Sequence, residues 1–202
     1  MSNIDWTPPE PRTGILGVWD KFVGPGATPG EEYVQLIGGL VLAGLLGMLV
    51  YQHRDALQWT GLQVAVVIVL GLDLIGGIIT NATATAKRWY HRPGQDTLRA
   101  HLPFVAAHGL HVLAITTLFR AMDWAFFVTV YGYLIVAAVI ILTVPLYLQR
   151  PMSLILFCGG FLLGMYVFPP TPGLEWFIPF FYLKLLVSHL PKEAPFVAGR
   201  RA

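Results

Sequence analysis

The sequence places one acidic residue and several histidines inside long apolar segments. Asp73 lies in one such segment; His101 stands at the start of the next, which contains His108 and His111. A charged side chain in hydrocarbon costs on the order of 3 kcal/mol on insertion scales and usually marks a functional site. Histidine can bind a metal or carry protons near neutral pH, and a neighbouring carboxylate orients the ring and raises its basicity. These residues are therefore the first candidates for chemistry.

Helical geometry brings the candidates together. At about 100° and 1.5 Å per residue, the three histidines fall within roughly 80° of one helix face and span about 15 Å of its length. Helices joined by a short loop usually pack side by side. We therefore predict that Asp73 contacts His108 or His111, and that Asn81 faces His101.

The last apolar segment adds two more ionisable side chains, Lys184 and His189, in the half that lies nearer the C-terminus. The predicted catalytic set is therefore Asp73, His108, His111, Lys184 and His189. In this set Asp73 is the acid–base group or a carboxylate that supports the ligands from behind, and His108 and His111 are metal ligands or proton carriers. The alternative is a buried hydrogen-bond network that only holds the helices together.

A basic aromatic cluster follows the segment that contains Asp73. Lys87, Arg88 and Arg92 lie close to Trp89, Tyr90 and His91. One interpretation is ordinary anchoring at the membrane surface by positive and aromatic residues. The other is a substrate site for an anionic head group, formed by Asn81, Lys87, Arg88 and Arg92.

These residues must be positioned by membrane helices. Hydrophobic residues make up 55% of the 202 residues, charged residues only 12%, and the mean hydropathy is +0.64. Soluble domains usually carry about 25% charged residues. A helix needs roughly 20 apolar residues to cross a bilayer. The sequence predicts an all-α polytopic membrane bundle with about six such helices, at residues 33–51, 57–84, 102–119, 124–148, 152–168 and 174–190.

The segments outside the spans complete the predicted organisation. Residues 1–32 form an N-terminal tail, residues 33–190 the transmembrane domain and residues 191–202 a C-terminal tail. Ile15, Leu16, Trp19 and Phe22 recur at helical spacing, which predicts a short amphipathic helix over residues 14–23. Thr13, just before it, is a candidate cap. We expect this helix to lie in the membrane surface.

Charge placement predicts the orientation. The two tails and the loops after the second and fourth spans contain ten Lys and Arg residues, whereas the loops after the first, third and fifth spans together contain two, Arg54 and Arg120. Positive residues accumulate on the cytoplasmic side. We therefore expect a multi-pass protein of the cell membrane with both termini in the cytoplasm.

The remaining features limit the partners. No basic stretch suggests nucleic acid, and the single cysteine, Cys158, excludes an intrachain disulfide. Gly39, Ala43 and Gly47 form a stripe of small residues that favours close helix packing, within the chain or in a homo-oligomer. The expected partners are the lipid bilayer and a lipid-soluble or anionic small molecule.

Three functions agree with this pattern. The first is a membrane-embedded enzyme that acts on a lipid-soluble or lipid-linked molecule, with an Asp/His site in the cytoplasmic half of the bilayer. The second is a small proton-coupled transporter or channel that uses the same groups. The third is a heme- or quinone-binding electron carrier, with His189 and a histidine of the third span as axial ligands. The sequence does not fix a cofactor: the enzyme would use a divalent metal or acid–base side chains alone, and heme, the less favoured cofactor, belongs to the third function.

Overall fold

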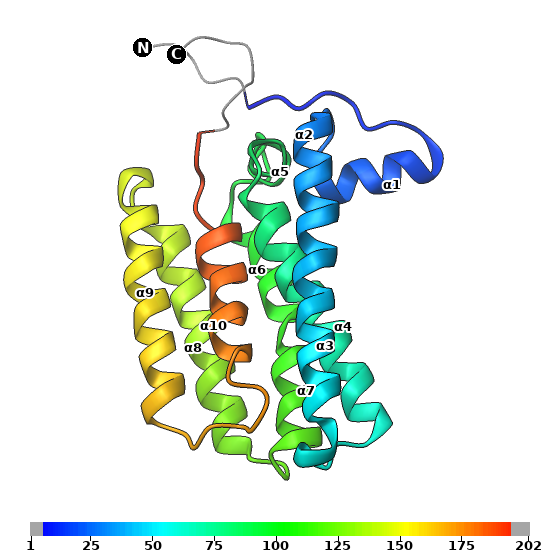
Figure 1. Cartoon of the computed structure of the whole chain (residues 1–202). Coiled ribbons are helices and arrows are strands. Elements are labelled where there is room, and N and C mark those ends of the chain that lie inside the picture. Colours follow the sequence, from blue (N-terminus) through cyan, green and yellow to red (C-terminus); the bar gives the residue numbers. More distant parts are fainter. Residues whose placement is uncertain (1–5, 195–202) are drawn as a thin grey trace.

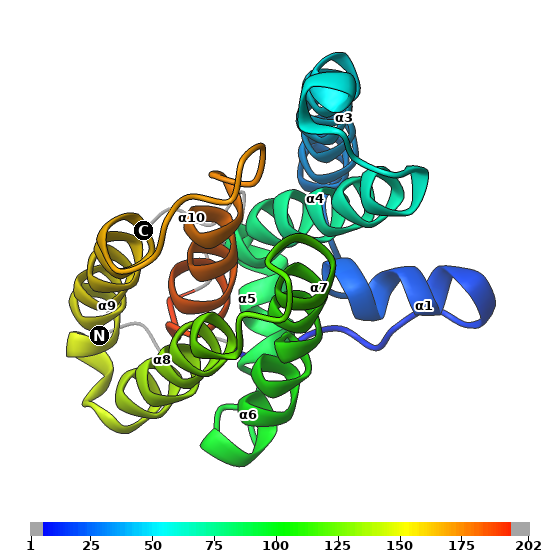
Figure 2. The same cartoon turned by 90° about the horizontal axis from the view of Figure 1, so that it is seen from below.

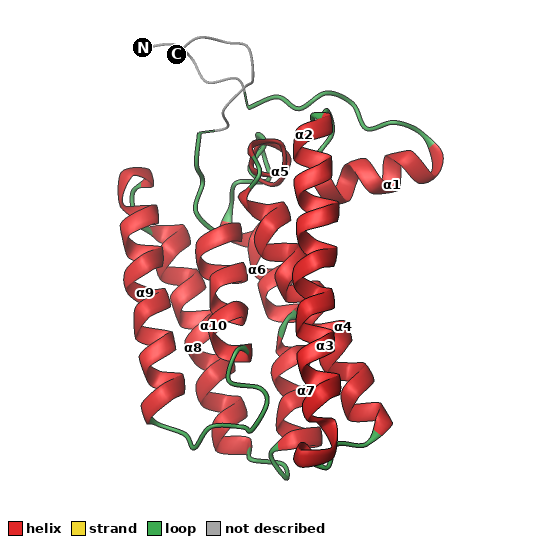
Figure 3. Cartoon of the chain, viewed as in Figure 1, coloured by secondary structure: helices red, strands yellow, loops and turns green. Residues whose placement is uncertain are grey.

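The computed structural model describes residues 6–194, and within this range every regular element is a helix (Figures 1 and 3). Five segments are long and apolar enough to cross a membrane: Pro29–Leu57, Gly61–Ala82, Leu98–Phe119, Trp124–Thr143 and Leu146–Tyr166. A shorter apolar segment, Phe177–His189, stands where the sixth span was expected. The polytopic helical bundle is thus confirmed.

The chain runs through twelve elements in order. They are α1 (Gly14–Val23), α2 (Pro29–Tyr33), η1 (Val34–Gly38), α3 (Gly39–Leu57), α4 (Gly61–Ala82), α5 (Ala84–Tyr90), α6 (Leu98–Ala107), α7 (Gly109–Phe119), α8 (Trp124–Thr143), α9 (Leu146–Tyr166), α10 (Phe177–Tyr182) and η2 (Leu183–His189). The two η elements are turns of wider, π-helical geometry.

The first membrane segment begins earlier than predicted, at Pro29. Thr28 caps it by accepting a hydrogen bond from the Glu31 amide. The Glu31 carboxylate also accepts from the Thr85 hydroxyl at 2.7 Å, which ties α2 to α5. Figure 2 shows α3 at the edge of the bundle beside α4, and Gly39 packs against Gly76 of that helix. The small residues of α3 therefore serve packing within the chain.

The third membrane segment is broken at His108, between α6 and α7. The break frees backbone carbonyls, which must find donors at this depth. The His108 side chain donates from Nδ1 to the Phe104 carbonyl at 2.8 Å. The Tyr131 hydroxyl donates to the Ala106 carbonyl at 3.2 Å.

The last segment changes its winding at Leu183. Beyond this point the Leu190 amide donates to the Leu185 carbonyl, five residues earlier, at 3.1 Å. This segment lies in the middle of the bundle and packs against α4, α8 and α9 (Figure 1). The buried Tyr182 side chain helps to fix it, because its hydroxyl donates to the Val130 carbonyl at 3.0 Å.

Helix α1 has the predicted bounds but not the predicted cap. Thr13 makes no side-chain capping bond. Instead the Arg12 guanidinium, just before the helix, binds Asp20 within it at 2.6 Å and so ties the preceding segment to the helix. Figure 2 shows α1 projecting sideways from the bundle, and Ile15 and Val18 are 89% and 70% exposed. Such an unpartnered apolar face is typical of a helix that lies in a membrane surface.

The described parts of both chain ends meet at one end of the bundle, beside α5 (Figure 1). Lys192 binds Asp96 at 2.7 Å and lies 4.6 Å from the centre of the Trp6 ring. The Lys87 ammonium donates to the Pro191 carbonyl at 2.8 Å. We call this the basic end; the loop at residues 167–176 lies at the opposite end.

Candidate functional site

Three nitrogen-bearing side chains converge on one carboxylate oxygen, Oδ2 of Asp73. His111 Nε2 lies 2.8 Å from it and Lys184 Nζ lies 2.5 Å from it. His108 Nε2 lies 3.9 Å away, and its ring stacks on that of His111 at a centroid distance of 4.8 Å. The predicted contact between Asp73 and the histidines of the third segment is confirmed. We call these four residues the Asp73 cluster.

Helix α4 supplies both the acid and the space for its partner. Lys184 is 3% exposed and crosses α4 at Gly77. A β-carbon at Gly77 would stand 2.3 Å from Lys184 Cε and 3.0 Å from Nζ. The absence of a side chain at this position therefore lets the ammonium reach Asp73.

The hydrogen bond to Phe104 defines the tautomer of the neutral His108 ring. The Phe104 carbonyl can only accept, so His108 Nδ1 carries the hydrogen in that bond. In the neutral ring Nε2 then carries a lone pair, and this atom faces Asp73. His111 differs, because its Nε2 donates to the carboxylate and its buried Nδ1 has no partner among the described residues. In its neutral form, His108 thus has a ring nitrogen with a lone pair that faces Asp73.

The Asp73 cluster is open on one side. The Asp73 side chain is 44% exposed although it lies within a membrane helix. Exposed residues close to it along α4, Val69 and Leu72, are apolar, and so is Leu110, which precedes His111 on α7 and is 68% exposed. Since apolar residues exposed in a membrane helix face lipid, we infer that the exposed side of Asp73 opens to the hydrocarbon. We call it the lateral opening.

Asp73, His108 and His111 also form a group that could hold a metal ion, with ligand atoms within 4.8 Å of one another. Carboxylate and imidazole groups suit a divalent metal. However, Lys184 occupies the carboxylate oxygen that such a metal would use and places a positive charge beside it. The residues therefore fit an acid–base site better than a metal site.

His189 belongs to a different cluster from the one predicted. Its Nε2 lies 3.1 Å from Nδ1 of His101, and its backbone carbonyl accepts from His91 Nε2 at 3.0 Å. His101 therefore faces these rings, where Asn81 had been expected. We call His91, His101 and His189 the histidine trio. The direct contact between His101 and His189 leaves no room for a macrocycle between them, which argues against the heme interpretation.

The histidine trio and the Asp73 cluster are separated by one aromatic ring. The centre of the Phe104 ring lies 4.4 Å from that of His189 and 4.6 Å from that of His108. His91 lies in the turn after α5 and is nevertheless only 1% exposed. A signal was available, since it directly follows the Trp-Tyr pair that ends the short helix α5.

The four predicted substrate-binding residues do not form one anion grip. Lys87 turns inward and is 4% exposed, and burial lowers its pKa to about 8, opposed by the charge of Glu193. Arg92 stacks on Trp89 at 3.7 Å. Asn81 is buried at the end of α4. Of the three cations, Arg92 lines a pocket at the basic end.

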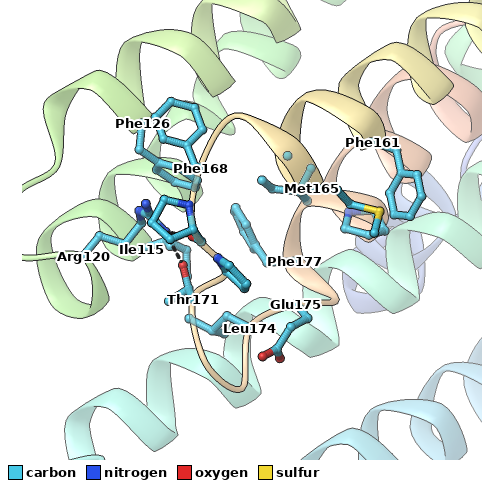
Figure 4. A pocket seen from close by; sticks show the side chains of 15 residues that line it. Ile115, Arg120, Phe126, Phe161, Met165, Phe168, Thr171, Leu174, Glu175 and Phe177 are labelled. Carbon is cyan, nitrogen blue, oxygen red and sulfur yellow. Dashed lines mark hydrogen bonds between the residues drawn. The ribbon is translucent and has the colours of Figure 1, made fainter.

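A larger pocket of about 350 Å³ lies at the opposite end of the bundle (Figure 4). Its walls are mostly apolar and include Phe126, Phe168 and Phe177. Arg120 also lines it, but this guanidinium already binds Asp123 at 2.9 Å and Thr171 at 2.7 Å. None of the predicted site residues lines this pocket.

Comparison with protein-family models, with curated proteins and with solved structures gives no match to this chain.

Proposed function

We propose that this protein is a membrane-embedded enzyme that performs acid–base chemistry on a lipid-soluble or lipid-linked small molecule. One observation carries the proposal: a carboxylate that holds a buried lysine and two histidines is exposed toward lipid through the lateral opening. A purely structural ion pair gains nothing from such exposure, because hydrocarbon penalises it. A substrate that diffuses in the bilayer reaches the carboxylate directly.

The geometry suggests a role for each group. His108 Nε2 is the base that removes a proton from the substrate, since its Nδ1–H is fixed by the Phe104 carbonyl. Lys184 stabilises negative charge that develops on the substrate, as cationic donors do in water-excluded sites. Asp73 holds Lys184 and His111 in place and keeps the ammonium charged.

A proton-coupled transporter is the second candidate. The helix break at His108 favours it, because transporters often build their binding sites at discontinuous membrane helices. In that case Asp73 and Lys184 would exchange a proton during transport, and no substrate would change chemically.

The decisive experiment compares membrane extracts from cells that produce the protein or a variant. The wild type should change the amount of at least one lipid-soluble species, and Asp73→Asn should abolish this change at equal levels of inserted protein. If both give identical extracts, and reconstituted vesicles show pH-driven uptake that requires Asp73, the protein is a transporter. Metal analysis of the purified wild type tests the metal alternative, since a stoichiometric divalent ion would contradict the acid–base assignment.

Two neighbouring glycines provide a matched pair of variants. Gly77→Ala should displace the flexible end of Lys184 and lower activity by on the order of 100-fold, as small misplacements in catalytic sites do. Gly76→Ala adds the same methyl group where no atom lies within 4 Å and should leave activity unchanged. Equal activity of the two variants would show that activity does not depend on this placement of the Lys184 ammonium.

A further inference from the structure

A small pocket of about 190 Å³ lies beside the histidine trio, at the basic end. Its lining includes Arg92, Gln95, His101, Phe104 and His189, and no acidic residue lines it. Every polar side chain among these can donate a hydrogen bond, and one carries a permanent positive charge. The pocket therefore suits an anion.

The two histidines add a more specific pattern. Both are 3% exposed, and the nitrogens not shared between them, His101 Nε2 and His189 Nδ1, have no partner among the described residues. In the neutral pair one ring donates to the other across the 3.1 Å contact. Whichever ring donates, one outer nitrogen then carries a hydrogen and the other carries a lone pair. The pair thus offers one donor and one acceptor, and leaving both unpaired is costly.

Arg92 supplies the charge. Its Nη1 donates to the Trp89 carbonyl at 2.5 Å, and its guanidinium lies flat on the Trp89 ring. Nε and Nη2 make no hydrogen bond within the part of the chain that the structure describes. A guanidinium held by stacking, with free N–H groups, is well suited to bind phosphate oxygens.

We propose that this pocket binds a phosphate monoester or hydrogen phosphate, provided by a lipid head group or by free phosphate. Such a group has oxygens that accept from Arg92, Gln95 and one histidine. Near neutral pH it also carries part of the time an O–H that donates to the other histidine, since its second pKa is about 6. A phosphodiester and sulfate lack this hydrogen, so both should bind less tightly than a monoester of similar charge.

The position of the pocket connects it to the Asp73 cluster. His101, Phe104, His108 and His111 follow one another at spacings of three, four and three residues, which places them on one stripe of α6 and α7. A lipid phosphate beside His101 would lie roughly 10 Å from the level of His108. The chain of that lipid would then run past Phe104 toward Asp73. The claim that this pocket holds the head group of the substrate rests on the proposed function. The claim that the pocket binds phosphate does not.

The test titrates the purified full chain, in a neutral detergent, with inorganic phosphate and with sulfate by calorimetry. Phosphate should bind about tenfold or more tightly than sulfate, and Arg92→Gln should weaken phosphate binding by a similar factor. Arg88→Gln is the matched control, because Arg88 lies in the last turn of α5, one turn before Arg92, but does not line the pocket. Equal loss in both variants, or equal binding of both anions, would overturn the proposal.

A second arm distinguishes the source of the phosphate. The protein is placed in phosphatidylcholine nanodiscs that contain either phosphatidic acid, a monoester, or phosphatidylglycerol, a diester. It is then released from the nanodiscs, and native mass spectrometry identifies the lipids that it retains. Preferential retention of phosphatidic acid, lost in Arg92→Gln, supports a lipid head group. Binding of inorganic phosphate without lipid retention supports free phosphate. If the protein neither retains phosphatidic acid nor binds inorganic phosphate, the proposed site is refuted. Asp73→Asn should bind phosphate like the wild type, so this test does not depend on turnover.

Discussion

Asp73 and Lys184 compensate each other's charge between α4 and η2. The Lys184 side chain is 4% exposed, so removal of its partner leaves an ammonium in an apolar environment. Losing one member of a buried ion pair costs about 3–5 kcal/mol, whereas replacing both members by uncharged groups is often close to neutral. We expect Asp73→Asn to lower the free energy of unfolding by this amount, and the double variant with Lys184→Met to recover most of it.

Denaturant unfolding in detergent measures this cycle. Asp55→Asn is the control, because Asp55 is 84% exposed and pairs with Arg54 at the surface, where ion pairs contribute about 0–1 kcal/mol. A double variant less stable than both single variants would show that the ion pair does not couple these residues.

His91 should make stability depend on pH. Burial, followed by the charges of His101 and Lys87, lowers the pKa of His91 to about 3 from 6.5. The unfolded chain therefore binds a proton that the folded chain rejects, and stability falls as pH drops from about 6.5 toward 3. The slope contributed by this residue is at most about 1.4 kcal/mol per pH unit.

Thermal unfolding between pH 7.5 and pH 5 checks this expectation. His91→Gln should show a shallower decline of melting temperature than the wild type, although it starts lower because the bond to the His189 carbonyl is altered. His53→Gln, on the exposed side of α3, should follow the wild-type slope. A slope unchanged in His91→Gln would assign the acid sensitivity to other groups.

Sequence reasoning reached the Asp73 cluster but missed the histidine trio. Depth along neighbouring helices can be counted from the sequence, and matched depth was enough to pair Asp73 with His111. The direction of a side chain around its helix axis cannot be derived from its residue number when the helix changes from α to π winding. Lys184 and His189 are five residues apart on a wide turn, so one reaches Asp73 while the other reaches His101. The sequence carries no comparable signal for that turn.

At the scale of elements, α1 depends on close contact with α5. Gly24 ends α1 with a φ of +96°, and a β-carbon there would lie 2.6 Å from the carbonyl group of Thr85. Gly24→Ala should displace α1 from α5 and speed proteolysis of the segment at residues 24–28. Gly14→Ala has a similarly unfavourable φ of +66° but no atom within 4 Å, and should be cleaved like the wild type. Equal cleavage of the two variants would exclude steric anchoring at Gly24.

The helix break at His108 lay beyond prediction for a related reason. Leu98–Phe119 reads as one apolar segment, and Pro103 does not coincide with the break. The break is made possible by donors from other places, the His108 ring and the Tyr131 hydroxyl of α8. Such compensation depends on tertiary packing, whereas the bounds of α1 follow from local periodicity alone.

At the scale of the whole molecule, the charge distribution predicts the orientation. The basic end contains most of the Lys and Arg residues and the described parts of both chain ends, so we propose that it faces the cytoplasm. A reporter fused to the C-terminus should be active on the cytoplasmic side, and one inserted at residues 169–173 on the other side. Activity of both fusions on one side would refute the six-segment topology.

The last membrane segment is short for its task. It contains the six residues of α10 and the seven residues of η2, which at 1.5 Å per residue cover about 20 Å of a hydrocarbon core that is about 30 Å thick. The loop at residues 167–176 and its pocket fill the remaining depth (Figure 4). If water enters this pocket, the insulating layer beside Lys184 is thinner than elsewhere, and the membrane voltage falls over a shorter distance. A proton that moves to or from Asp73 in the proposed reaction would then do so in a steeper electric field than in an ordinary bilayer.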